Sequence, residues 1–254
     1  MNRWMHFTVV FLSAALMLLL LAACGPASEP GASSAASSGS SSTSGKEEPA
    51  SSSEAPADSG DEPADTRTDA QKWAESRTMT YLRSHNITPE NVSFTASYQV
   101  EKTDDVNYVS YQARGDKAIL TCYMDAEESE PYQLIYKYGT AYYLGIPDGG
   151  NGETEWHTAP TYIKQEFEAV LKICKIPTST EPVVLTGFGT KDPNVEIASL
   201  SHMSYRFTLN ALGKIEKVRT VYKNEYYNAV FDTLEPCPAG TTFTKPTVQS
   251  TTNQ

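Results

Sequence analysis

The sequence predicts an α+β domain in which an antiparallel sheet packs against helices. Short segments that alternate apolar and polar residues, joined by turn residues, are typical of antiparallel strands. Two other segments place apolar residues at the spacing of an amphipathic helix. All these elements fall within residues 67–254, which we expect to form a single domain. Its 188 residues suffice for a hydrophobic core, and we expect that core at about residues 70–238.

The two predicted helices end near prolines. The first has an apolar stripe that Arg77 interrupts, and Pro89 lies beyond its end. Its stripe consists of Ala70, Trp73, Ala74 and Tyr81. We expect Trp73 to anchor the core rather than to contact a ligand. The second helix ends before Pro177, and its uninterrupted stripe consists of Ile163, Phe167, Val170, Leu171 and Cys174.

A first group of strands follows the first helix. Strict alternation over residues 92–101 predicts a half-buried strand. Gly139-Thr140 has the glycine-first pattern of a two-residue hairpin turn. The further strands of this group are expected at 106–113, 117–124, 132–138 and 141–146. Strands in this order form a meander.

A second group of strands follows the second helix. These strands are expected at 182–188, 195–200, 203–209, 214–222 and 226–234. Between the two groups, residues 147–155 contain three glycines and few apolar anchors, so we expect a mobile loop there. The tail after Pro238 is polar and is expected to be loose.

The residues before the domain indicate export. An apolar run at 7–23 follows a short positive segment with Arg3, as in a signal peptide. The run ends in Leu21-Ala22-Ala23-Cys24, which resembles a bacterial lipobox. The resemblance implies a signal peptide at 1–23, a lipid on Cys24 and a location on the extracytoplasmic face of the cell membrane. The alternative is an uncleaved membrane helix, for which a run of 17 residues is short.

Residues 24–66 are expected to form the lipidated cysteine and a disordered tether. From Gly25 to Thr66 the chain has no Val, Ile, Leu, Met, Phe, Tyr or Trp. Burial of apolar side chains therefore cannot offset the conformational entropy that the segment would lose on folding. The segment is either a spacer that lifts the domain off the membrane or tolerated low-complexity sequence. The eight acidic residues and one lysine of this segment supply most of the chain's net charge of −11. The domain itself is mildly acidic, which argues against a nucleic-acid partner.

Two segments resemble the bacterial lipoprotein-carrier (LolA-like) superfamily, which includes lipid-binding envelope lipoproteins. One is the hairpin at 135–144, Ile-Tyr-Lys-Tyr-Gly-Thr-Ala-Tyr-Tyr-Leu. The other is the hairpin at 205–218, Tyr-Arg-Phe-Thr-Leu-Asn-Ala-Leu-Gly-Lys-Ile-Glu-Lys-Val, followed by Ala229-Val230-Phe231. The resemblance covers roughly residues 80–234. It implies a strongly curved antiparallel sheet, a half-open barrel, packed against two or three helices that close an apolar cavity.

A lipid or other hydrophobic ligand in that cavity would contact residues on one face of the sheet. The candidate lining residues are Tyr98, Leu120, Leu134, Tyr136, Tyr205 and Phe207. Because side chains two apart on a strand share a face, we expect Leu134 and Tyr136 to point to the same side as Tyr132. The abundant tyrosines also have an ordinary explanation, since tyrosine suits a pleated, half-wet surface.

Cys122, Cys174 and Cys237 are an odd number, so at most one disulfide can form among them. Cys122 and Cys174 fall on apolar stripes, where each can act as a small buried hydrophobic residue. Cys237 is the other candidate partner for Cys174. The sequence leaves the connectivity open.

The sequence contains no catalytic motif that we recognise. His6, His85, His157 and His202 lack metal-ligand spacing, and no nucleophile elbow, phosphate loop or zincin motif is present. We therefore expect no enzyme, metal or cofactor.

Three classes of function stay open. The first is an envelope lipoprotein that binds a lipid or other hydrophobic ligand. The second is a non-catalytic protein-interaction or sensory module, whose sheet edge or acidic face engages another envelope protein. The third is a two-lobed solute receptor, for which 188 residues are few.

Overall fold

The computed structural model describes residues 65–148, 153–188 and 191–248. The expected signal peptide, Cys24 and nearly all of the tether therefore lie outside the described residues. The described part contains three helices, α2 (Asp69–Ala74), α3 (Arg77–Ser84) and α4 (Thr161–Ile173). None of the three is long and apolar enough to cross a membrane.

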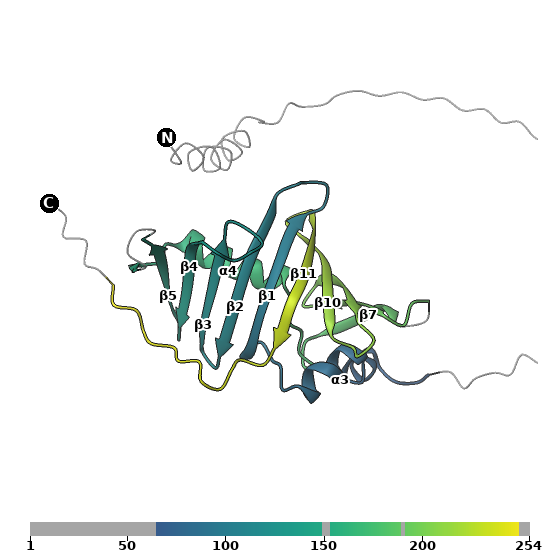
Figure 1. Ribbon diagram of the computed structural model, residues 1–254. Coiled ribbons are helices and arrows are strands. Elements are labelled where there is room, and N and C mark those ends of the chain that lie inside the picture. The colour runs from purple at the N-terminus through teal and green to yellow at the C-terminus, as the bar shows by residue number, and fades with distance from the viewer. Residues whose placement is uncertain (1–64, 149–152, 189–190, 249–254) are drawn as a thin grey trace, which may run out of the picture. The chain divides into compact units, whose positions relative to one another are not determined.

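Eleven strands of the described part form one antiparallel sheet (Figure 1). Their bounds are β1 (Asn91–Val100), β2 (Val106–Arg114), β3 (Lys117–Tyr123), β4 (Pro131–Tyr138), β5 (Ala141–Pro147), β6 (Thr154–Thr158), β7 (Val183–Phe188), β8 (Val195–Leu200), β9 (Met203–Leu209), β10 (Ile215–Tyr222) and β11 (Glu225–Glu235). Their order in the sheet is β6-β5-β4-β3-β2-β1-β11-β10-β9-β8-β7.

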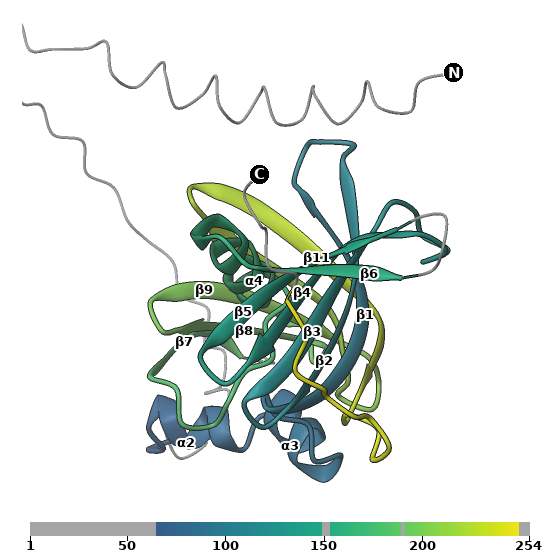
Figure 2. The same ribbon diagram turned by 90° about the vertical axis from the view of Figure 1, so that its left-hand side faces the viewer.

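The sheet consists of two meanders joined at its centre. Strands β1 to β6 form the first meander, α4 follows, and β7 to β11 form the second. The last strand returns to the first, with Ser97 of β1 opposite Val230 of β11. The sheet is strongly curved and β6 and β7 remain as its two edges, so the barrel stays half open (Figure 2). This is the α+β fold that the resemblance implied.

The single helix predicted at the start of the domain is wrong, because the chain breaks between α2 and α3. The Ser76 side chain caps α3 by accepting a hydrogen bond from the Met79 amide. The carboxylate of Glu196, a buried residue of β8, accepts hydrogen bonds from the amides of Arg77 (2.9 Å) and Thr78 (3.2 Å). An anion at the first turn satisfies amides that a helix leaves unpaired, so a distant strand stabilises this break.

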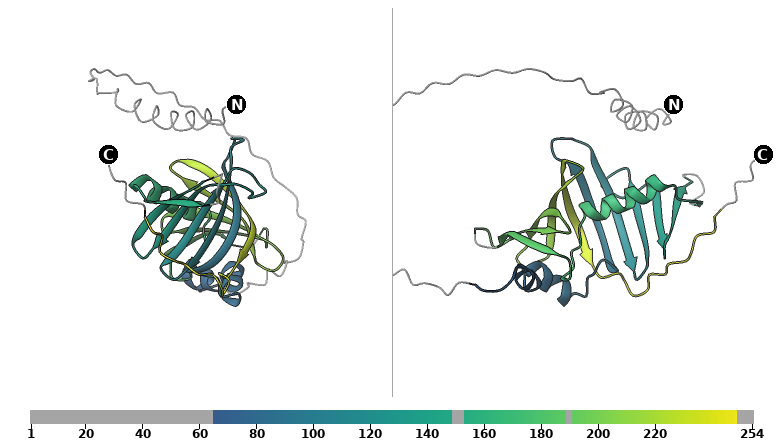
Figure 3. Two further views of the ribbon diagram at one scale, coloured as in Figure 1. Left: turned by 60° about the vertical axis from the view of Figure 1, so that its left-hand side comes forward. Right: turned by 180° about the vertical axis from the view of Figure 1, so that it is seen from behind.

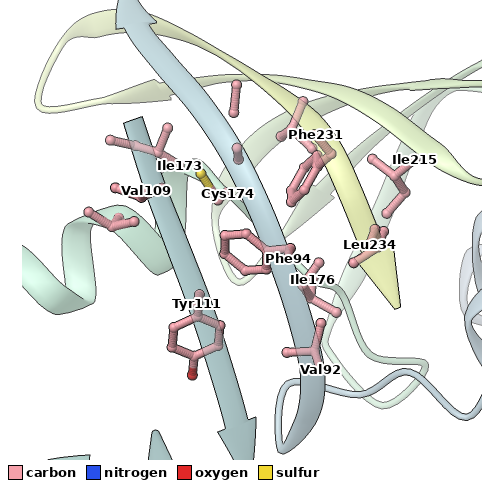
Figure 4. Packing of buried hydrophobic residues seen from close by; sticks show 14 of the residues in the cluster. Val92, Phe94, Val109, Tyr111, Ile173, Cys174, Ile176, Ile215, Phe231 and Leu234 are labelled. Atoms are coloured by element: carbon pink, nitrogen blue, oxygen red, sulfur yellow. The ribbon is translucent and has the colours of Figure 1, made fainter. Parts of the chain in front are cut away.

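The hydrophobic core lies on the concave face of the sheet, which we call the inner face. Phe94 is central to it, with its ring 5.2 Å from that of Tyr111 and 5.3 Å from that of Phe231 (Figure 4). Trp73 of α2 is fully buried and its ring lies 5.8 Å from that of Phe207, which confirms its predicted role in the core. The alternation predicted for β1 is confirmed by its buried residues, Val92, Phe94 and Ala96.

Helix α4 lies across the inner face (Figure 3). Of its predicted stripe, Ile163, Phe167, Val170 and Cys174 are buried and Leu171 is half-buried. The Phe167 ring packs edge-on against the rings of Tyr111 (5.9 Å) and Tyr142 (5.4 Å). Burial of such side chains stabilises each by roughly 1.5–3 kcal/mol, so the helix is held by its packing rather than by a side-chain cap, which it lacks.

One strand was missed by the sequence analysis. Residues Thr154–Thr158 form β6, which pairs with β5 and places Trp156 opposite Gly145. The expected mobile loop at 147–155 therefore overlaps two strands, and residues 149–152 lie outside the described part. A five-residue strand with one large apolar side chain gives too little periodicity to be recognised.

Candidate functional site

Four of the six candidate lining residues lie together on the inner face. Leu120 and Phe207 are 0% exposed, Tyr205 is 2% exposed, and Tyr98 packs partly buried against the same core. The Tyr205 and Phe207 rings stack 5.9 Å apart. Phe207 also packs against Trp73 of α2. All four residues belong to the hydrophobic core or pack against it, so they are core residues in this structure.

The other two candidates, Leu134 and Tyr136, lie on the opposite face, and the predicted common face with Tyr132 is wrong. In the ladder between β3 and β4, Cys122 pairs with Gln133 but Tyr123 pairs with Pro131, which leaves Tyr132 as an extra residue. This β-bulge turns Tyr132 inward, where it packs on the core, whereas Leu134 follows the regular alternation outward. Ile135, fully buried, is the inward residue between Leu134 and Tyr136.

Tyr136 belongs to a group of rings on the outer, convex face that we call the outer aromatic cluster. Its ring lies 6.4 Å from Tyr138, 6.5 Å from Tyr143 and 6.0 Å, edge-on, from Trp156. Tyr136 and Tyr143 are 4% and 7% exposed, which is unusual for the side of a sheet that faces away from the core. The ammonium of Lys117 lies 4.7 Å from the Tyr138 ring and borders the cluster.

Gly145 makes room for this cluster. It lies between Leu134 of β4 and Trp156 of β6 in the sheet, and the indole of Trp156 covers it. A Cβ atom at this position would lie 2.8 Å from Cγ2 of Thr154 and 2.9 Å from the indole. A glycine within a strand signals such close approach, and this signal in the sequence could have pointed to the site.

The C-terminal residues cover the cluster. Residues 237–244, which we call the strap, run along the end of the sheet where β2 and β4 end, and the ring of Phe243 lies 6.3 Å from that of Tyr136 (Figures 1 and 3). The tail after Pro238 was expected to be loose, but its first part is held in place. Phe243 is a lone aromatic residue in a polar tail, and this was the signal in the sequence that the residue had a role.

Arg114, the last residue of β2, holds the start of the strap. Its Nη1 donates hydrogen bonds to the carbonyl oxygens of Ala239 (2.9 Å) and Thr241 (3.2 Å). Its Nη2 donates to the carbonyl oxygens of Cys237 (3.0 Å) and Pro238. All four acceptors are main-chain atoms, and three of them belong to the turn at 238–241, in which the Thr241 amide donates to the Pro238 carbonyl oxygen (2.9 Å). Arg114 thus holds the main chain of this turn rather than its side chains.

The hydroxyl of Tyr136 is buried beneath this arrangement. Its oxygen has no hydrogen-bond partner among the described residues. Burial, and the neighbouring Tyr138, raise the pKa of Tyr136 above its usual value, so the hydroxyl stays protonated and can both donate and accept.

Two pockets of the described part are large enough to note. One, of about 390 Å³, lies between the strap and the turn from β2 to β3; it is lined by Arg114, Asp116, Lys117 and the strap residues Thr241, Thr242, Phe243 and Thr244. The other, of about 200 Å³, lies beside α3; it is lined by Met79, Leu82, Arg83, Asn86, Ile87, Thr88, Pro89, Pro177, Thr178 and Ser179. Neither contains any of the six candidate lining residues.

A group of polar side chains interrupts the apolar inner face at α4. It consists of Glu166, Gln133, Cys122 and Tyr132. Glu166 of α4 lies near Gln133, and burial raises the pKa of its carboxyl, an effect that the Gln133 amide reduces. The side chains of Cys122 and Tyr132 share a hydrogen bond close to it. Burial raises the pKa of the Cys122 thiol to about 12, and Glu166 adds to this shift, so the group offers no ready nucleophile.

All three cysteines of the described part are free and buried. The interpretation of Cys122 and Cys174 as small buried hydrophobic residues therefore holds, and no bridge joins Cys174 to Cys237. No three His, Cys, Asp or Glu side chains of the described residues gather as a metal site. His85 and His202 are exposed and His157 is half-buried beside Glu155.

No family model matches the chain, and no curated protein matches it. Among solved structures, the chain is similar to the Pseudomonas aeruginosa MucA/MucB complex, at 12% identity and a TM-score of 0.34 over 68% of this chain and 59% of that chain. A second structure, MucB in complex with MucA(peri), gives 12% identity and a TM-score of 0.33 over 68% of this chain and 58% of that chain. A structure of PNGF-II gives 12% identity and a TM-score of 0.29 over 59% of this chain and 28% of that chain. The chain thus spans less than two thirds of the length of each, and similarities this low indicate nothing about its function.

Proposed function

We propose that the protein is a non-catalytic protein-interaction module, held on the extracytoplasmic face of the cell membrane by a lipid on Cys24, and that it binds its partner through the outer face of the sheet. The observation that carries the proposal is that the outer face of the sheet already holds a polypeptide segment, the strap. A surface built from rings and a main-chain-binding arginine is suited to a protein partner, since interfaces are enriched in tyrosine, tryptophan and arginine.

The packing of the inner face favours this function over binding of a lipid in a central cavity. Leu120, Tyr205 and Phe207 are at most 2% exposed, and they belong to the hydrophobic core. A hydrophobic ligand could enter between these side chains only if the covering helices moved off the sheet, which would expose apolar residues such as Phe167 of α4 and Trp73 of α2.

The anchor is tested by Cys24→Ser followed by membrane fractionation. We expect the variant to leave the membrane pellet, because the tether has no apolar residue that could hold a bilayer. Cys237→Ser is the matched control and should stay in the pellet. A Cys24→Ser protein that is processed normally yet remains in the pellet would show that something other than lipidation holds it.

Site-specific photo-crosslinking in cells tests the interaction surface. A photoreactive phenylalanine analogue at Tyr138, in the outer aromatic cluster, should give a defined adduct with another protein. The same analogue at Tyr162, an aromatic residue on α4 that is 54% exposed, should give none. Native mass spectrometry of the purified domain provides the alternative outcome: a stoichiometric bound lipid together with no adduct at Tyr138 would favour a hydrophobic ligand and refute the proposal.

A further inference from the structure

We propose that the partner binds through a short polypeptide segment, a turn followed by an aromatic residue whose side chain inserts into the outer aromatic cluster, and that the strap occupies this site until the partner displaces it. The inference rests on the proposed function, because it names the class of partner that the outer face binds. It also assigns the strap a role, that of an internal competitor.

The strap shows which features of a peptide the surface recognises. Arg114 donates to four main-chain carbonyl groups of residues 237–241, which include the turn at 238–241, and it makes no hydrogen bond to their side chains. The side chains of strap residues 241–244 are threonines except for Phe243, whose ring is the only one of them placed against Tyr136. Recognition thus combines an unspecific hold on the main chain with one aromatic anchor, and a segment of another protein can reproduce both.

The strap leaves the site incompletely satisfied. The buried hydroxyl of Tyr136 has no partner among the described residues, although Phe243 packs near the same ring. An unpaired buried hydroxyl weakens the arrangement that contains it. A partner with a carbonyl or a polar side chain near its aromatic anchor could pair with this hydroxyl. Such a partner would bind the cluster better than the strap does.

The strap also leaves space unfilled. The pocket of about 390 Å³ between its threonines and the side chains of Arg114, Asp116 and Lys117 lies beside the position of Phe243. Residues larger than threonine next to the aromatic anchor would fit there. The unpaired hydroxyl and the unfilled pocket are independent observations, and both indicate an occupant other than the strap.

A tethered competitor weakens the binding of every external peptide. Phe243 follows the end of β11, Glu235, by only eight residues, so its effective concentration at the cluster is on the order of millimolar. Removing its ring should therefore raise the affinity for a peptide that carries the same features. The strap sequence itself, supplied as a separate peptide, is the probe that the structure provides.

The experiment uses the exported chain, residues 24–254, and a fluorescein-labelled peptide with the sequence of residues 237–246, its cysteine replaced by serine. Fluorescence anisotropy should give a Kd for Phe243→Ala that is at least about tenfold lower than for the wild-type chain. The matched control Tyr162→Ala, which removes an exposed ring from α4, should bind the peptide as the wild type does. A peptide with alanine in place of its phenylalanine should lose most of its affinity for Phe243→Ala.

The hydroxyl is tested in the same assay with a second set of peptides. Peptides in which each residue beside the phenylalanine is replaced in turn by Asn, Gln or Ser are compared on Phe243→Ala and on Phe243→Ala with Tyr136→Phe. At least one polar replacement should bind the first protein about tenfold more tightly and lose that gain on the second. If none does, Tyr136 Oη has no role in recognition.

The inference is overturned if Phe243→Ala, shown to be folded by circular dichroism, binds the strap peptide no better than the wild type does. It is equally overturned if the alanine-substituted peptide binds as well as the strap peptide. In either case a Tyr138 adduct in cells would still support the proposed function, so the two proposals can fail separately.

Discussion

The guanidinium of Arg114 lies against the main chain at Ala239, whose carbonyl oxygen accepts a hydrogen bond of 2.9 Å from Nη1. This contact joins the end of β2 to a segment 125 residues later in the chain. It ties down the strap independently of Phe243, so the two attachments can be separated by mutation.

Arg114→Ala should release the start of the strap. Its hydrogen bonds are partly solvent-exposed, and a net loss of about 1.4 kcal/mol would raise the population of the detached strap about tenfold. Chymotrypsin should then cleave after Phe243 about ten times faster, measured by mass spectrometry of the C-terminal fragment. Arg219→Ala, which removes an arginine paired with the exposed Glu101, is the control and should leave the rate unchanged. An unchanged rate in Arg114→Ala would mean that Phe243 alone retains the strap.

Gly145→Ala should destabilise the outer aromatic cluster. The added methyl group would lie 2.8 Å from Thr154 Cγ2 and 2.9 Å from the Trp156 indole, so the indole must move off Tyr136. Overpacking of this kind costs about 1–3 kcal/mol. We expect a lower melting temperature and altered tryptophan fluorescence. Gly240→Ala is the control and should change neither the melting temperature nor the fluorescence, because a Cβ there would meet nothing within 4 Å. A Gly145→Ala protein as stable as the wild type would show that the cluster is loosely packed.

The strands and their faces could be predicted where local periodicity determines them. From Val92 to Ala96 the alternation in the sequence matches the burial in the structure, because both faces of β1 are set by one uninterrupted pattern. The glycine-first turn at Gly139 was also predictable, since its φ of 61° is a conformation that few other residues adopt. These features depend only on neighbouring residues.

The features that the sequence did not predict depend on distant residues. The break before α3 is stabilised by Glu196, and the cover of the outer aromatic cluster by Phe243, each more than 100 residues from the group it contacts. No local pattern encodes such pairs. Leu134 and Tyr136 were therefore expected on the wrong face of the sheet, and the other four candidates lie on the expected face but within a packed core.

Glu166→Gln should change how stability depends on pH. Burial raises the folded-state pKa of Glu166 above its unfolded value, so folding favours the protonated carboxyl. The stabilisation that the raised pKa of Glu166 provides is fully present below the unfolded-state pKa of about 4.3. It is lost as the pH rises through the folded-state pKa. Urea unfolding should therefore show similar stability for the two proteins at pH 4 and greater stability for Glu166→Gln at pH 7. A constant difference between them across this range would contradict the raised pKa.

Leu134 and Ile135 are adjacent on β4, and a carboxylate placed at each should have opposite consequences. Ile135 is fully buried on the inner face, where a charge cannot be hydrated, so Ile135→Glu should lower the free energy of unfolding by several kcal/mol or prevent folding. Leu134 is half-buried on the outer face, so a glutamate there can reach water, and Leu134→Glu should remain folded by circular dichroism. The bulge at Tyr132 determines which of the two residues points inward. Without it, Leu134 would share the inner face with Tyr132, and Ile135 would point outward. A folded Ile135→Glu together with an unfolded Leu134→Glu would mean that the register of β4 is shifted by one residue and that Tyr136 belongs to the core.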